Sequence, residues 1–188
     1  PDPTFLRVTK ISAGTLKHFF NQMQYLHPGS TLIFENERDD ETITYHSEEG
    51  LVDYLKLIAK DDDKSDLAGK VVSLSGDGSA QVMGNEVNMR LNLAMGLSKK
   101  ENGRVLAFTN TTYNKLGGTH ESGFYAGCLD LLRHYYKTFK NEIDNRNKAR
   151  INLILEANKV TELEKLFKRK PVEDRFYAVI DLKHDDPE

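Results

Sequence analysis

Hydrophobic residues recur at helical spacing in three segments of the chain. Apolar side chains at steps of three and four residues predict an amphipathic helix from Thr15 to Leu26, which Pro28-Gly29 ends. A second such pattern predicts a helix from Leu51 to Ala59. A third, longer helix is expected after Gly117-Gly118, with Thr119 as its cap. The predicted inner face of this helix consists of Phe124, Cys128, Leu131, Leu132, Tyr135 and Phe139.

Strict alternation of apolar and polar residues marks the strands. It is clearest in Val87 to Leu93 and in Phe176 to Leu182, and the apolar run Arg104 to Asn110 is expected beside the first of these. Two shorter strands, Thr31 to Glu35 and Glu41 to Tyr45, are typical of a hairpin. Together with the helices, these strands predict an α+β domain with a mixed or antiparallel sheet covered by a few helices.

Polar and charged stretches connect these elements. Gly76-Asp77-Gly78 is predicted to be a turn between strands, and Lys60 to Asp66 a solvated loop. From Asn141 to Lys170, apolar residues are spaced among many charges, which predicts two helices or one broken helix. Within it, Thr161 and Glu164 have the spacing of a capping box.

Composition narrows the classes of protein that the chain fits. Its 188 residues suit a single domain, and 26 basic against 29 acidic residues give a formal net charge of −3. No apolar run approaches the roughly 18 to 20 residues of a membrane helix, and no secretory signal is visible at the first residues. The single cysteine, Cys128, excludes an internal disulfide and fits a reducing compartment.

Residues for independent catalysis are scarce. The six histidines are dispersed, and with one cysteine they form no zinc-binding pattern, so no metal site is expected. Neither a nucleophile elbow nor a phosphate-binding loop ending in Gly-Lys-Ser/Thr occurs. Because Cys128 lies on the apolar face of its helix, it is expected to be buried and inert.

The densest polar cluster runs from Asn110 to Phe124, where a strand ends and a helix begins. Free N–H groups at that helix start could hold an anion. The alternative is architectural: the two glycines let helix and strand pack closely, while Thr119 and His120 satisfy backbone groups. Local physics alone favours the architectural interpretation.

This cluster also carries a resemblance to a known family. Phe108-Thr109-Asn110, Gly117-Gly118-Thr119-His120 and Gly123-Phe124 resemble the F-x-N…G-G-T-H-x-x-G-F signature of the ATPase-bearing B subunits of type IIA DNA topoisomerases, gyrase and topoisomerase IV. Agreement continues in order along nearly the whole chain. Further matching stretches are Pro1-Asp2-Pro3, Leu16 to Asp39, Tyr45 to Leu51, Ala178 to Lys183, and Asp186-Pro187.

The matching region of that family is the transducer domain, and the resemblance implies its fold and role. It implies a left-handed βαβ fold, related to a ribosomal-protein domain, that couples ATP binding and hydrolysis in a neighbouring GHKL domain to DNA strand passage. Residues 1–188 would then be one transducer domain excised from a larger chain, with a helical insertion at about 141–170. The intact enzyme would use ATP and Mg. This fragment would bind neither of them and would be inactive alone. Gyrase and topoisomerase IV stay equally open.

The resemblance also implies partners, which are duplex DNA, an A-type DNA-cleaving subunit and a second B subunit joined through the ATPase domain. It implies a cytoplasmic location and no membrane partner. Catalytic residues are not expected in this segment. A motif and coupling role is expected for Asn110, Lys115, Gly117, Gly118, Thr119 and His120.

The resemblance implies a cavity for duplex DNA lined partly by basic residues, and the candidates to face it are Arg133, Lys137 and Lys140, together with Lys165, Lys168, Arg169 and Lys170. A solvated helix face is favoured over this role, because the neighbouring Glu142, Asp144, Glu162 and Glu164 offset the basic charges. The alternative to coupling is a stand-alone module of the same fold that binds nucleic acid or acts like a chaperone middle domain, without catalysis.

Overall fold

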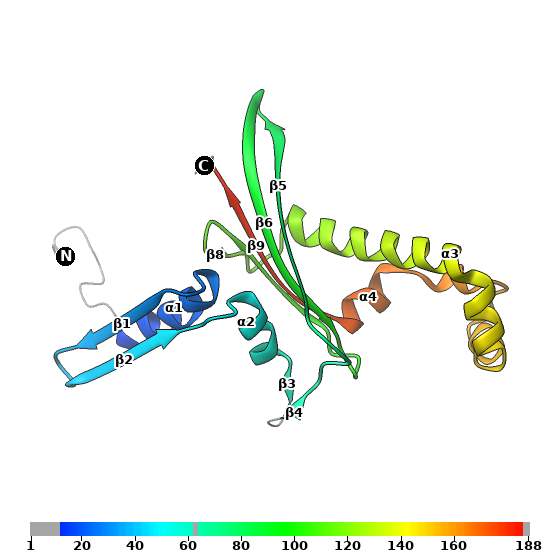
Figure 1. Ribbon diagram of the computed structural model, residues 1–188, viewed down its shortest axis with the longest axis horizontal. Coiled ribbons are helices and arrows are strands. Elements are labelled where there is room, and N and C mark those ends of the chain that lie inside the picture. Colours follow the sequence, from blue (N-terminus) through cyan, green and yellow to red (C-terminus); the bar gives the residue numbers. More distant parts are fainter. Residues whose placement is uncertain (1–11, 62–63, 186–188) are drawn as a thin grey trace.

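The computed structural model describes residues 12–61 and 64–185. Its main sheet has five strands in the order β5-β6-β9-β7-β8, and helices lie on both of its sides (Figure 1). The helices are α1 (Ala13–Leu26), α2 (Leu51–Ile58), α3 (Thr119–Ala157), the 3-10 turn η1 (Leu163–Leu166) and α4 (Arg169–Arg175). The strands are β1 (Thr31–Asn36), β2 (Glu41–His46), β3 (Lys60–Asp61), β4 (Lys64–Ser65), β5 (Val72–Val82), β6 (Asn85–Leu97), β7 (Arg104–Thr109), β8 (Thr112–Tyr113) and β9 (Phe176–His184).

The sheet is mixed, which confirms the predicted α+β class. Strand β9 runs parallel to β7 and antiparallel to β6, and all the other pairs are antiparallel. A βαβ unit therefore runs from β7 through α3, η1 and α4 to β9. The expectation that Arg104 to Asn110 lies beside Val87 to Leu93 is wrong, because β9 is inserted between them. Periodicity cannot reveal such an insertion, since the two partners of β9 lie far from it in sequence.

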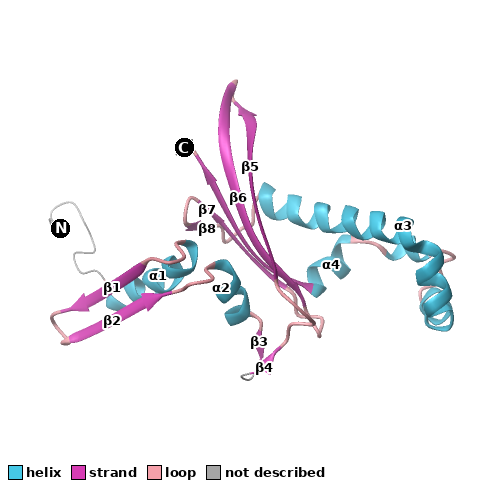
Figure 2. Ribbon diagram, in the orientation of Figure 1, coloured by secondary structure: helices cyan, strands magenta, loops and turns pink. Residues whose placement is uncertain are grey.

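Each face of β9 contacts a different hydrophobic core. On one face, α1 and α2 pack over a cluster that includes Leu55, Phe108 and Val179, which are entirely shielded from solvent. On the other, α3 and α4 pack over Tyr125, Cys128 and Val172. Figure 2 shows α2 and α3 on opposite sides of the sheet. Because both faces are covered, residues 177–181 of β9 are buried throughout, as in a central strand.

The β1–β2 hairpin and its turn are confirmed, but the turn predicted at Gly76-Asp77-Gly78 is wrong. These residues lie within β5, where Gly76 pairs with Leu91 and Gly78 with Met89. The chain reverses instead at Met83 and Gly84, whose φ angles of 49° and 86° suit a two-residue hairpin.

The loop predicted at Lys60 to Asp66 is also wrong in part. Strands β3 and β4 form a short hairpin there, and Asp66 is buried at 3% exposure. Its carboxylate accepts hydrogen bonds from the Ser98 hydroxyl at 2.5 Å and the Tyr177 hydroxyl at 3.3 Å. These bonds hold the hairpin against the end of the sheet and lower the pKa of Asp66, the Ser98 bond most of all.

Two caps differ from those predicted. Gly118, rather than Thr119, is the N-cap of α3, and no side chain caps that end. The 3-10 turn begins after Glu162, so Thr161 and Glu164 form no capping box; the Thr161 hydroxyl accepts a hydrogen bond from Lys165 Nζ. The broken helix is confirmed, because α3 has non-helical backbone angles at Phe139 and Asn147.

The predicted inner face of α3 holds only near its start. Phe124 and Cys128 contact the sheet, whereas Leu131, Tyr135 and Phe139 are 58%, 56% and 40% exposed. The far part of α3 extends away from the sheet (Figure 1). In this part of the helix, packing against η1 buries Tyr136 and Ile151 instead.

Candidate functional site

The polar cluster of the sequence lies where β7, β8 and β9 end and α3 begins. A two-residue turn joins β7 to β8, and both of its residues, Asn110 and Thr111, have left-handed φ angles of 45° and 68°. Asparagine tolerates this region, whereas a β-branched threonine rarely adopts it. The turn is therefore held by its surroundings rather than by local preference.

Asn110 holds the end of β9 to this turn. Its backbone N–H donates to Leu182 O at 2.9 Å, and its side-chain amide donates to His184 O at 3.2 Å. In return, the His184 N–H donates to Asn110 Oδ1 at 3.0 Å. We call this three-bond arrangement the Asn110 clamp.

The loop from β8 to α3 is also tied to β7. Asn114 donates its backbone N–H to Ala107 O at 2.9 Å and its side-chain amide to Thr109 Oγ1 at 3.1 Å. Gly117 N–H then donates to Asn114 O at 3.0 Å. The same short loop thus fixes the start of α3 relative to the β7 end that Asn110 clamps.

The two glycines are required for different reasons. Gly117 has a left-handed φ of 73°, and a Cβ there would meet Glu121 Oε2 at 2.7 Å. Gly118 has extended backbone that any residue adopts, but a Cβ would lie 2.6 Å from His120 Cε1. The imidazole therefore packs against the backbone at the start of α3.

His120 is half-buried in this position. Burial lowers its pKa, and the nearby Glu121 carboxylate opposes that shift. Its Nε2 atom is shielded from solvent and has no hydrogen-bond partner among the described residues. The ring borders an apolar groove of about 600 Å³ between the start of α3 and the sheet, which is also lined by Phe124, Leu91 and Ile180.

The other residues expected at this site lie at the surface of the molecule. Lys115 and Thr119 are exposed, and Leu116 next to Lys115 is fully exposed. The structure therefore brings together Asn110, Gly117, Gly118 and His120, while Lys115 and Thr119 stand at the rim. Among the described residues, no group of three histidine, cysteine or acidic side chains is arranged to bind a metal ion.

The three residues expected to face DNA differ from one another. Arg133 pairs with Asp130 at 3.4 Å and donates to Phe167 O, and Lys140 lies 6.0 Å from the centre of the Tyr136 ring. Within the part of the chain that the structure describes, Lys137 has no carboxylate partner.

Two residues near the site were not identified from the sequence. His184 contributes backbone groups to the Asn110 clamp, which no sequence motif signals. Asp181 is 1% exposed, and burial raises its pKa although Lys183 Nζ lies 3.5 Å away. An aspartate within the apolar run Ala178 to Leu182 was the available signal for this buried acid.

In the described part of the chain, every helix is too short or too polar to cross a membrane. The buried Cys128 thiol, expected to be inert, has its pKa raised to about 11 by burial.

Comparison with known proteins shows the family. The family model described as DNA gyrase B matches residues 50–153, more than half of the chain. The DNA gyrase B protein of Helicobacter pylori strain 26695 is 30% identical over 135 residues, which is 72% of this chain and 16% of that protein. The DNA topoisomerase 4 B protein of Streptococcus pneumoniae is 26% identical over 135 residues, 72% of this chain and 19% of that protein.

The fold agrees with a solved structure of a gyrase B protein. The crystal structure of the 43K ATPase domain of Thermus thermophilus gyrase B matches all of this chain and 44% of that one, with a TM-score of 0.68 and 18% identity. The chain thus spans less than half of that structure and under a fifth of the two relatives named above. It belongs to the DNA gyrase B family of type IIA topoisomerases.

Proposed function

We propose that this chain is the transducer region of a topoisomerase B subunit, which couples ATP binding and hydrolysis in a neighbouring domain to DNA strand passage. Family membership and the fold shared with a gyrase B ATPase-domain structure support the proposal. On this proposal, residues 1–188 form one domain with an insertion at about 141–170. The whole enzyme uses ATP and Mg, acts on duplex DNA with an A-type subunit, and works as a homodimer in the cytoplasm.

The observation that carries the coupling role is the Asn110 clamp. It joins the end of β9 to the β7–β8 turn through three hydrogen bonds, and the loop that follows the turn leads directly into α3. Since α3 runs without a break from Thr119 to Phe139, a small displacement at the end of β9 becomes a larger one at that break. A packed lever of this kind transmits a two-state change without catalytic residues of its own.

The experiment replaces Asn110 by alanine in the intact B subunit, assembled with its A-type partner. We expect ATP hydrolysis to be retained while ATP-driven supercoiling or decatenation falls about 5- to 150-fold, because removing both side-chain bonds costs roughly 1–3 kcal/mol of clamp stability.

The matched control is Asn36→Ala. Asn36 also donates one side-chain bond, to Asp39, and accepts one, from Arg38 N–H, but in the β1–β2 turn far from the clamp. It should leave both activities close to those of the unsubstituted enzyme. His120→Ala is expected to destabilise or uncouple the domain as Asn110→Ala does. Full ATP-driven strand passage in both the Asn110 and His120 variants would refute the coupling role.

A further inference from the structure

Charge is strongly segregated along this nearly neutral chain. Residues 133–170, which we call the basic arm, contain eleven basic and five acidic residues, a net charge of +6. Residues 31–49, which we call the acidic hairpin, contain seven acidic residues and one basic residue, a net charge of −6. Figure 1 shows this hairpin at one end of the long axis and the far part of α3 at the other. Charges of equal size and opposite sign make the two ends of different copies electrostatically complementary.

Part of the hairpin's charge is neutralised within the molecule. Glu35, Glu37 and Asp40 are exposed and have no basic partner among the residues that the structure describes. Their charge therefore remains available to a partner. The carboxylates that do have a basic partner belong to the pairs Lys17–Glu41, His46–Glu48 and Lys56–Glu49.

One face of the hairpin is covered by α1, and the other face is open. On the covered face, the centre of the Phe20 ring lies 6.0 Å from that of Phe34 and 6.2 Å from that of Tyr45. Alternate residues of a strand point to opposite faces, so Ile33 and Glu35 of β1 lie on the open face. Both are exposed, Ile33 at 57%. The open face thus presents a large aliphatic side chain beside a free carboxylate.

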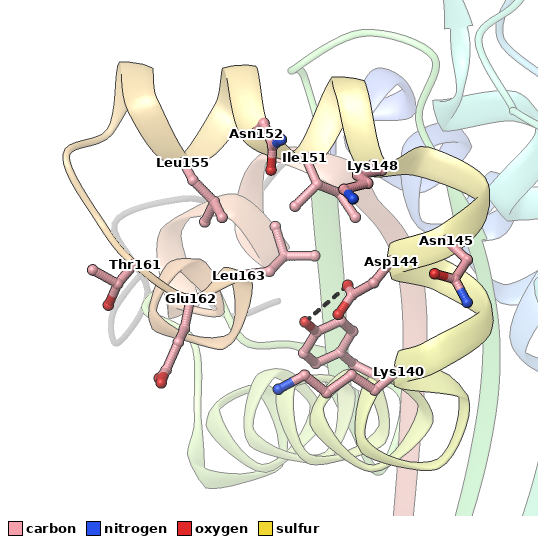
Figure 3. Close-up of a pocket in the computed structure, with 11 residues that line it drawn as sticks. Lys140, Asp144, Asn145, Lys148, Ile151, Asn152, Leu155, Thr161, Glu162 and Leu163 are labelled. Atoms are coloured by element: carbon pink, nitrogen blue, oxygen red, sulfur yellow. Dashed lines mark hydrogen bonds between the residues drawn. The ribbon is translucent and has the colours of Figure 1, made fainter.

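The last part of α3 is also covered on one side. Ile151 and Leu155 line a pocket of about 280 Å³ together with Leu163 of η1 (Figure 3). Arg150 and Leu153 do not line this pocket, and both are exposed, Leu153 at 67%. Because they are three residues apart on a helix, they are neighbours on its surface. This outer face of the arm thus presents a large aliphatic side chain beside a cation.

The charge of this outer face is not compensated within the molecule. Arg146 and Arg150 are exposed and have no carboxylate partner in the described part of the chain. The outer face of the arm and the open face of the hairpin therefore have the same composition, one aliphatic side chain with free charges, but the charges are opposite in sign. Other cations of the arm do have carboxylate partners, in the pairs Arg133–Asp130, Lys165–Glu162, Arg169–Glu173 and Lys170–Asp174.

We propose that the outer face of the basic arm docks on the open face of the acidic hairpin of a second copy of this chain. In this contact Leu153 packs against Ile33, which removes both side chains from water. The guanidinium groups of Arg146 and Arg150 face the carboxylates of the hairpin, whose geometry suits paired hydrogen bonds. Because the two faces lie at opposite ends of the molecule, two antiparallel copies make the contact twice and form a closed dimer.

A second copy is the partner that satisfies both surfaces at once. A ligand that offered charge alone would leave Leu153 and Ile33 in water, whereas each face of this chain supplies the aliphatic and the ionic complement of the other. The contact uses neither the Asn110 clamp nor ATP. It therefore stands or falls separately from the coupling role.

The test measures self-association of the 188-residue chain by sedimentation velocity over a series of protein concentrations. We expect a dimer that weakens between about 0.1 M and about 1 M salt, since charges interact over about 10 Å at the first concentration and about 3 Å at the second. One variant reverses the charge of the arm, Arg146→Glu with Arg150→Glu, and another that of the hairpin, Glu35→Lys with Glu37→Lys. Each variant alone brings like charges together, which should raise the dissociation constant at least about 100-fold.

An equimolar mixture of the two variants is the decisive sample. The reversed arm of one variant then meets the reversed hairpin of the other, and the two unsubstituted faces also meet. Both contacts of the dimer are complementary again, so we expect a dissociation constant within about tenfold of that of the unsubstituted chain. Restoration in the mixture also shows that both variants are folded, which far-UV circular dichroism checks independently.

The control is Lys70→Glu with Arg104→Glu, which changes the net charge as much as the arm variant does, at exposed residues outside both faces. It should dimerise like the unsubstituted chain. An equal loss of the dimer in this control would show a general effect of net charge and overturn the proposal. A monomeric unsubstituted chain at low salt, or a mixture of the two variants that stays monomeric, would overturn it as well.

Discussion

His120 shows how one side chain at this site combines packing with electrostatics. Its ring occupies the space that a side chain at position 118 would need, and burial lowers its pKa. As a result, the neutral imidazole is favoured in the fold, and the free energy of unfolding becomes dependent on pH.

The sign of that dependence follows from which state binds the proton first. Because the pKa of His120 is lower in the folded chain, the unfolded chain takes up the proton first as the pH falls through about 6.5. Stability is therefore lost below that pH and levels off below the folded pKa.

We expect His120→Gln to remove this loss of folding stability at low pH. The difference in unfolding free energy between the unsubstituted chain and the variant should be larger at about pH 8 than at about pH 5.5, as measured by urea denaturation. A difference that stayed constant or grew on acidification would mean that His120 is protonated in the fold.

At the scale of the element, the start of α3 determines how the helix meets the sheet. Gly117 and Gly118 let the chain turn closely around Glu121 and His120, and further along the helix Gly127 has open space around it. Glycine is therefore required at the first two positions and merely tolerated at the third, where it weakens the helix.

Alanine substitution separates these two cases. Gly118→Ala should lower the free energy of unfolding by about 1–3 kcal/mol, because the new Cβ would overlap His120. Gly127→Ala should raise it by up to about 1 kcal/mol through helix propensity. Thermal unfolding of both variants measures the effects, and a stabilising Gly118→Ala would show that His120 can move aside without cost.

At the scale of the whole molecule, β9 connects two cores that share no helix. Leu55 belongs to the core under α1 and α2, and Cys128 to the core under α3. Since β9 is buried on both faces, we expect both cores to unfold as one cooperative unit.

The Cys128 thiol reports on this cooperativity. Because its pKa is about 11 and it is buried, it should react with a thiol reagent only when the chain opens. Leu55→Ala should cost about 2–5 kcal/mol and so speed labelling of Cys128 roughly 30-fold or more.

Leu57→Ala is the matched control, since Leu57 lies on the same helix but is 43% exposed. It should change the labelling rate little. Unchanged labelling in the Leu55 variant, despite lower global stability, would mean that the α3 core opens independently.

The sequence by itself determined the elements whose spacing is local. The α1 and α2 helices, the β1–β2 hairpin, β6, β9 and the break before α3 all followed from periodicity and from proline or glycine. The Gly117–His120 motif was also identified from the sequence, because its residue types and order are specific. These features depend on neighbours within a few residues, which is the range over which sequence patterns act.

Only the tertiary structure decided what depends on distant partners. It placed β9 between β6 and β7, buried Asp66 against Ser98 and Tyr177, and joined Asn110 to His184, 74 residues away. It also brought the Arg133 guanidinium of α3 to the backbone carbonyl of Phe167, 34 residues away. Burial and pairing are properties of surfaces in contact, and the residues that form those surfaces are far apart in the chain.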